Sequence, residues 1–147
     1  MADHLHAQIR AAVVSRLTGL TTSATRVYAN RLAPLPDATS PSLLITLDDE
    51  RAEGITIHQP QAQSRTLALS VAAVAKASTG LDATLDLMSK EVEIALAAGI
   101  TVGGRTLEVF YTGMSFEDEQ SDKPVGIKRM SFSIPFSAMS NAPDTLI

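Results

Sequence analysis

The stretch Ser42-Leu-Leu-Ile-Thr-Leu-Asp-Asp-Glu50 decides the fold class of this chain. In an extended conformation Leu43, Ile45 and Leu47 point to one side, and Leu44 on the other side is apolar as well. A run that is apolar on both faces is typical of a strand in the middle of a sheet. It ends abruptly in three acidic residues. The pattern therefore predicts a central strand whose end is exposed and charged.

Downstream of this strand, the hydrophobic period changes twice. Residues 64–76 alternate and predict a long strand, and Gly80 follows a short polar break. Apolar residues at spacings of three and four then predict a helix over 81–98. Two further alternating stretches predict strands at 106–116 and 125–136.

Upstream, residues 4–18 carry an apolar stripe at helical spacing, with Asp3 in the N-cap position and Gly19 where a C-terminal cap is expected. Residues 26–32 predict a short edge strand. Three prolines then exclude regular structure across residues 33–41. The element order is thus helix, three strands, helix, two strands.

This order predicts an α+β fold: a mostly antiparallel sheet of four to five strands with two helices packed on one face. A length of 147 residues fits one domain. We place that domain at residues 1–136 and expect residues 137–147 to form a flexible C-terminal tail, because their polar and small side chains show no periodicity.

The net charge of −4 is concentrated in two short segments, 48–53 and 117–123, each with three more acidic than basic residues. Each follows a predicted strand, and we expect both at the same end of the sheet. The simplest interpretation is two solvated turns. The functional alternative is a negatively charged rim made by Asp48, Asp49, Glu50, Glu53, Glu117, Asp118, Glu119 and Asp122.

The sequence lacks the patterns expected of an active site. There is no cysteine, so thiolate chemistry and cysteine metal sites are excluded. His4 and His6 are two residues apart on a helix and point in different directions, and His58 has no nucleophile or acid near it in sequence. Gly103-Gly104-Arg105 lacks the ending of a phosphate-binding loop. We therefore expect no enzyme activity, no catalytic residue, no metal and no cofactor.

Composition also limits the partners. An acidic chain with few clustered basic residues argues against a nucleic-acid-binding face. No apolar run approaches the roughly 20 residues that cross a membrane, so we expect no membrane partner.

Taken over residues 3–136, the pattern resembles the tail terminator proteins of long-tailed bacteriophages, the minor tail protein U type of phage lambda. The similarity rests on the order of elements, since no single motif is specific. Its pieces are the N-terminal helix, the proline-bearing lead into Ser42–Leu47, the acidic turn up to Gly54, the long strand 65–76, the helix after Gly80 and the acidic hairpin 116–132.

The resemblance implies a structural role in the phage tail, with assembly in the cytoplasm of the bacterial host. Proteins of this type form a hexameric ring that caps the tail tube, ends its polymerisation and provides the surface that joins the head. The implied partners are further copies of the chain, the tail tube protein and the head-tail connector or neck proteins. DNA only passes through the lumen, and the acidic segments would lie at the lumen or at an interface.

Two other interpretations remain open. One is a different phage neck or tail-completion protein of related fold, which would differ in stoichiometry. The other is a small α+β enzyme or ligand-binding domain that dimerises. The latter predicts a concave pocket with converging polar groups, whereas a ring subunit predicts flat, charged surfaces.

Overall fold

The computed structural model describes residues 3–29, 41–76, 80–119 and 125–147. The prolines at 34 and 36 and most of the predicted connection lie outside these ranges. The described elements are, in chain order, α1 (Leu5–Leu17), β1 (Val27–Ala29), β2 (Ser42–Gly54), β3 (Ala62–Lys76), α2 (Leu81–Ala97), β4 (Ile100–Val102), β5 (Arg105–Leu107), β6 (Phe110–Glu119), β7 (Val125–Met139) and β8 (Ala142–Leu146).

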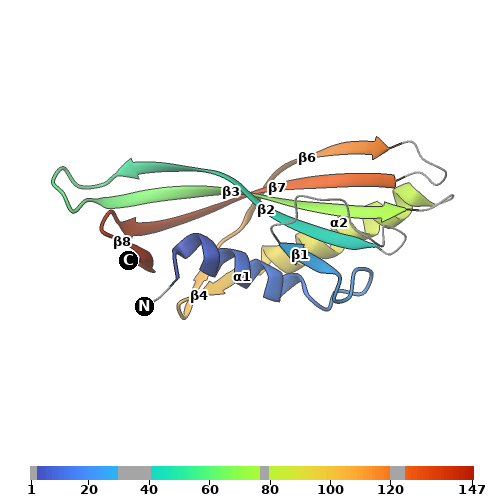
Figure 1. Cartoon of the computed structure of the whole chain (residues 1–147), viewed down its shortest axis with the longest axis horizontal. Coiled ribbons are helices and arrows are strands. Elements are labelled where there is room, and N and C mark those ends of the chain that lie inside the picture. Colours follow the sequence, from blue (N-terminus) through green and yellow to red (C-terminus); the bar gives the residue numbers. More distant parts are fainter. Residues whose placement is uncertain (1–2, 30–40, 77–79, 120–124) are drawn as a thin grey trace.

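The main sheet has the strand order β1-β2-β3-β7-β6, and β8 pairs with the far half of β7. Only the β1–β2 pair is parallel; β2–β3, β3–β7 and β6–β7 are antiparallel. Both helices lie on one face of this sheet, while β4 and β5 form a separate hairpin (Figure 1). The predicted α+β class with a mostly antiparallel sheet is confirmed, and the sheet has six strands.

Helix α1 packs through the apolar stripe that its sequence predicted. Leu5, Ile9, Val13 and Leu17 are all buried in the main core. The N-cap is His4, whose Nδ1 accepts the backbone N–H of His6, so Asp3 does not cap the helix. Gly19 follows the C-cap with a φ of +94°, a left-handed conformation that favours glycine.

Helix α2 packs close to the sheet because a glycine lies beneath it. Leu85, Met88, Val92 and Leu96 are buried on its inner face. Beneath its first turns lies Gly126 of β7, where an added Cβ would stand 2.8 Å from Leu85 Cδ1. The missing side chain lets the helix approach the strand and close the core.

The predicted strand at 106–116 is split between two sheets. Residues up to Leu107 belong to β5 and pair with β4, whereas β6 begins at Phe110 and pairs with β7. The alternation of the sequence continues across the break, so periodicity alone does not reveal it.

The predicted flexible tail at 137–147 is wrong. Residues up to Met139 continue β7, and β8 folds back on it. Ala138 is fully buried in the core and Leu146 packs against it. The amide of Gln8 in α1 also donates to the carbonyl of Asp144 at 2.9 Å. The sequence did not predict this strand, because its small and polar residues show no periodicity. The strand forms by pairing with the end of β7.

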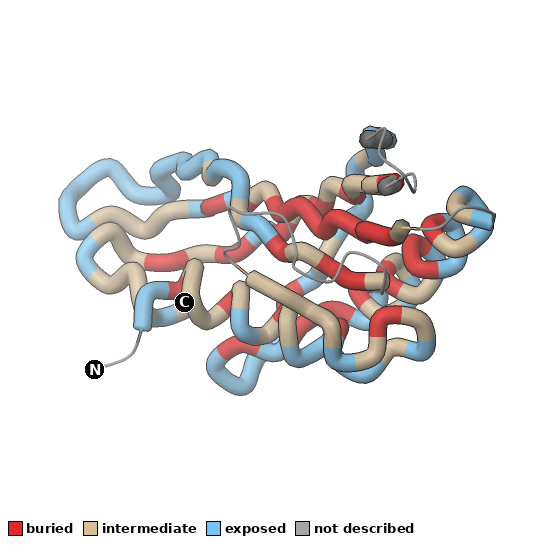
Figure 2. Tube along the Cα trace, turned by 45° about the vertical axis from the view of Figure 1, so that its right-hand side comes forward, coloured by how far each residue is buried: buried red, intermediate tan, exposed pale blue. Residues whose placement is uncertain are grey.

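The extent of burial differs along the length of the molecule. Buried residues gather in the central strands and the inner sides of the helices, while the connection between β2 and β3 is exposed (Figure 2). Its residues 55–61 form the tip of a long hairpin, with Ile57 almost fully exposed. The expected excursion at 54–63 is thus a turn between two strands that are longer than the sequence predicted.

Candidate assembly surfaces

The first acidic segment is part of strand β2, since the strand continues to Gly54. A shift in register between Leu47 and Glu50 marks a β-bulge. Asp48, Asp49 and Glu53 are exposed. Asp48 accepts a short hydrogen bond from the hydroxyl of Ser70 on the neighbouring strand. The segment is an ordered, charged strand edge, which differs from the solvated turn that the sequence suggested.

Glu50 is the exception among the acidic residues of β2. The bulge turns it to the face that carries the helices, where its Oε2 lies 2.5 Å from His6 Nε2 of α1. Its other oxygen lies 3.6 Å from Arg65 of β3, whose guanidinium also donates to Gln63 at 2.9 Å. Glu50 therefore joins helix α1 to two strands, and its contacts indicate a structural role.

The cap of α1 is sensitive to protonation. Desolvation by burial, together with the nearby His6 and Arg65, lowers the pKa of His4. A neutral imidazole is required there because a protonated Nδ1 cannot accept the His6 N–H. A lowered pKa in the folded state means that the folded protein prefers neutral His4. The resulting stability is complete above the unfolded value of 6.5 and is lost as the pH falls through the folded value.

We therefore expect the substitution His4→Asn to reduce the loss of stability between pH 7.5 and pH 5. Asparagine is a good N-cap without a titrating group. The measurement is the melting temperature of each protein across this range. We expect the fall in melting temperature from pH 7.5 to pH 5 to be smaller for the variant than for the wild type, by about one or two degrees. Parallel curves at every pH would show that the cap does not titrate. His58→Asn is the matched control, since His58 is exposed in the hairpin turn.

The second acidic segment lies at the end of β6. Glu117 is exposed, and the strand continues through Asp118 to Glu119, which pairs with Val125 of β7. Asp122 lies outside the described residues. As in the first acidic segment, the first residues of this second segment belong to a strand.

The two acidic segments do not share an end of the sheet, and that expectation is wrong. Glu119 pairs with Val125, which in turn pairs with Lys76. Lys76 lies at the end of β3 where β2 begins, because Ser42 pairs with Val74. Glu53 pairs with Ser64 at the other end. Two intervening antiparallel strands thus place the clusters at opposite ends, and a single shared acidic rim is excluded.

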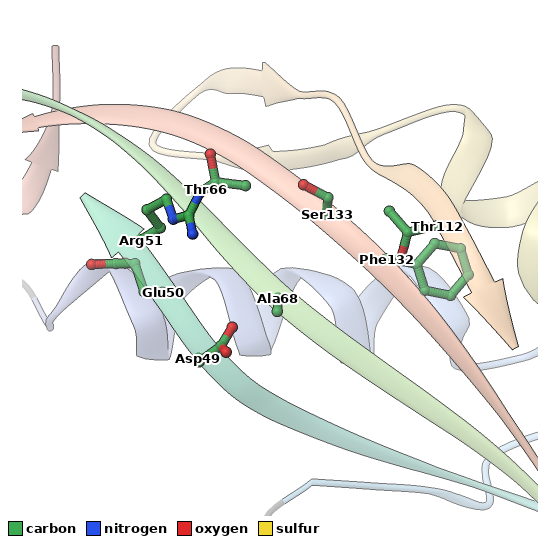
Figure 3. A pocket seen from close by; sticks show the side chains of 8 residues that line it. All are labelled: Asp49, Glu50, Arg51, Thr66, Ala68, Thr112, Phe132 and Ser133. Carbon is green, nitrogen blue, oxygen red and sulfur yellow. The ribbon is translucent and has the colours of Figure 1, made fainter. Parts of the chain in front are cut away.

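A hollow of about 500 Å³ lies where β2, β3 and β7 twist past one another. Figure 3 shows Arg51 beside Thr66 on its wall, with Glu50 pointing away and Phe132 and Thr112 at the far side. No histidine is among the described residues that line it. Across the described chain, no group of three or more histidine, aspartate or glutamate side chains is arranged to hold a metal.

Exposed apolar side chains gather on strand β6, which the sequence reasoning had not singled out. Tyr111, Met114 and Phe116 are 46%, 47% and 47% exposed. They pair with Phe132, Met130 and Lys128 on the helix-facing side of β7, so they belong to the face that the helices cover elsewhere. The sequence contained a signal for this surface, since apolar residues on an exposed edge strand are typical of an interface.

A comparison with known protein families gives a match over most of the chain. The family model of the phage minor tail protein U matches residues 4–136. The chain belongs to the phage minor tail protein U family. It is accordingly a tail-terminator-like structural protein of the virion, and it is not an enzyme. The resemblance in the order of elements is confirmed over nearly the same range.

Two solved structures are similar to this chain. A chain from the "Virion of native gene transfer agent (GTA) particle" is 18% identical, with a TM-score of 0.48, and the alignment covers 90% of this chain and 91% of that one. A second structure is 16% identical, with a TM-score of 0.56, and the alignment covers 88% of this chain and 94% of that one. No curated protein matches this chain.

The family match confirms the expected location. The protein is a component of the phage tail. Within the described residues, neither helix is long and apolar enough to cross a membrane.

Proposed function

We propose that this protein forms a six-subunit ring that caps the phage tail tube, ends its polymerisation and presents the surface that joins the head. Its partners in this proposal are copies of itself, the tail tube protein and the connector or neck proteins. The observation that carries the proposal is the family match over residues 4–136. The exposed apolar edge of β6 supports it, because an isolated subunit gains nothing from leaving such a strand uncovered.

The face of the sheet opposite the helices is suited to line the lumen. By register, Thr46, Ser64, Thr66, Ser131 and Ser133 lie on this face. Glu53 and Glu117 lie on the same face, one near each end of the sheet. By register Arg51 and Arg129 lie on this face as well, so it carries charges of both signs, and the carboxylates near its two ends repel the phosphates of DNA. We therefore retain a lumen or interface position for the exposed acidic residues and withdraw it for Glu50.

Stoichiometry tests the proposal directly. We expect native mass spectrometry and electron microscopy to find a ring of six subunits, either for the protein alone at micromolar concentration or after addition of tail tubes. Both conditions are needed, because closure of the ring can require contact with the tube. A different ring number would favour another neck or completion protein, and a monomer in both conditions would contradict the proposal.

A further inference from the structure

One half of the sheet projects past helix α2 as an arm (Figure 1). The arm consists of three strand segments, Glu50–Gly54 of β2, Ala62–Leu67 of β3 and Ile134–Met139 of β7. Its two edges matter for assembly, because an unpaired strand edge presents backbone N–H and C=O groups to which a strand of another molecule can add. A subunit of a closed ring therefore needs to protect any edge that lies outside the ring contact.

The outer edge of the arm belongs to strand β7. Along its inner edge, β7 pairs with β3 without interruption from Val125 to Met139. Two strands share its outer edge: β6 pairs with it as far as Ser133, and β8 pairs with it at Ala138 and Met139. The interval between β6 and β8 is only a few residues long, and Pro135 lies within it.

Pro135 removes a hydrogen-bond donor from this interval. The carbonyl of Ser137 accepts the N–H of Ile147 at 3.1 Å, so the backbone groups of Ser137 face the outer edge. In a regular antiparallel strand the backbone groups of every second residue face the same side, so those of Pro135 face outward as well. Because proline has no N–H, this position offers an added strand an acceptor but no donor.

Strand β8 ends the sheet on this side and is itself a poor edge for pairing. It has only five residues, Ala142–Leu146, and Pro143 within it has no N–H to donate. Contacts within the subunit hold it in place: Leu146 packs against the core, and the carbonyl of Asp144 accepts the side-chain amide of Gln8 on α1 at 2.9 Å. Short edge strands that carry proline and charge oppose edge-to-edge association.

The other edge of the arm, on β2, is protected by different means. Among the described residues, β1 pairs with β2 only as far as Ile45. Beyond the bulge that follows Leu47, the strand carries the exposed charges of Asp49, Arg51 and Glu53. Bulges and charged side chains both disfavour the addition of a strand. The two edges of the arm thus share this property, although their residues differ.

We propose that Pro135 and strand β8 form an edge guard, which prevents a second copy of this chain from adding a strand to the arm. The inference rests on the proposed function, since a protein that ends the growth of a tube must not itself continue to add subunits. The guard keeps the arm unpaired and confines association to the rest of the subunit. The family match ends at residue 136, so β8 lies outside the matched region.

The guard is tested by opening the outer edge of β7. In the open-edge variant, residues 142–147 are deleted and Pro135→Val restores the missing donor. We expect this variant to form assemblies that keep growing with concentration. They should appear at protein concentrations at least about tenfold below those at which the wild type associates beyond its ring. Light scattering over a concentration series measures both the size and the onset.

Two matched variants separate the guard from a general loss of stability. Deletion of residues 142–147 with Pro135 retained leaves the interval without its donor, so the onset should lie between those of the wild type and the open-edge variant. Leu146→Ala removes packing against the core but keeps β8 over the edge, so it should associate like the wild type. If Leu146→Ala associates as readily as the open-edge variant, lost stability is the cause and the guard is wrong.

A full-length variant provides a second test that does not depend on the deletion. Pro143→Val plus Asp144→Thr keeps β8 in place and opens its own outer edge, so it should also associate beyond the ring. Circular dichroism and melting temperature verify which variants fold. If the folded variants among these form nothing larger than the wild type, the guard is refuted and the proposed ring is unaffected. If the wild type is monomeric alone and with tail tubes, the proposed function fails, and the same variants still decide whether the edge is guarded.

Discussion

Replacing Gly99 by alanine is expected to destabilise the subunit by about 3 kcal/mol, with a fall in melting temperature of roughly 10 °C. Gly99 is buried at the end of α2 and has a φ of +81°. An added Cβ would stand 2.7 Å from the backbone carbonyl oxygen of Leu107 on β5. The left-handed conformation costs an alanine about 1 kcal/mol. The collision costs more, because a backbone oxygen inside a paired strand cannot turn aside.

The glycine at the end of the other helix separates these two costs. Gly19 has a φ of +94°, and an added Cβ there would meet no atom within 4 Å. Gly19→Ala should therefore cost only about 1 kcal/mol. Denaturant unfolding of the three proteins measures the difference. Equal losses at Gly19 and Gly99 would show that the β4–β5 hairpin does not press against the end of α2.

The hydrophobic periods were sufficient to predict the layers of this fold. The buried stripe of α1 and the alternation of β3 follow directly from the spacing of their apolar residues, since burial of one face imposes that spacing. The sheet edge was also predictable at β1, where a short and weakly alternating segment pairs along β2. Each of these elements follows from the local spacing of its apolar residues, and that spacing can be read from the sequence.

The errors have non-local causes. The break between β5 and β6 arises because Phe110 pairs with Ser133 of β7, whereas Leu107 pairs with Ile100. Strand β8 exists because β7 extends to Met139 and offers a free edge. Neither pairing changes the local pattern of side chains. The same holds for the acidic segments, whose separation depends on how many antiparallel strands lie between β2 and β6.

The contact between Glu50 and His6 depends on a single bulge. Without it, the alternation that sends Leu43, Ile45 and Leu47 to the helix-facing side would send Asp49 there. The register shift after Leu47 sends Glu50 there and leaves Asp49 exposed. No residue in this stretch is a glycine or a proline, so nothing in it marks the bulge. The acidic residue with a structural role could not be distinguished from its neighbours by sequence.

Replacing Glu50 by alanine is accordingly expected to cost about 3 kcal/mol. Only 17% of the Glu50 side chain and 10% of that of Arg65 are exposed. Removal of the carboxylate would leave the guanidinium of Arg65 buried without its opposite charge, and breaking one member of such a pair costs far more than the pair contributes. It would also release His6, and with it the contact of the first turn of α1 to β2.

Glu53→Ala is the matched control, because Glu53 lies on the same strand and is exposed. It should change stability by less than about 0.5 kcal/mol. Glu50→Gln should fall between the two, since the amide keeps the shape and one acceptor but loses the charge. The free energy of unfolding from urea titration orders the three variants. If Glu50→Ala and Glu53→Ala behaved alike in stability and Glu50→Ala instead altered ring assembly, Glu50 would belong with the exposed acidic residues of the lumen or interface. Its place between α1, β2 and β3 favours the opposite outcome.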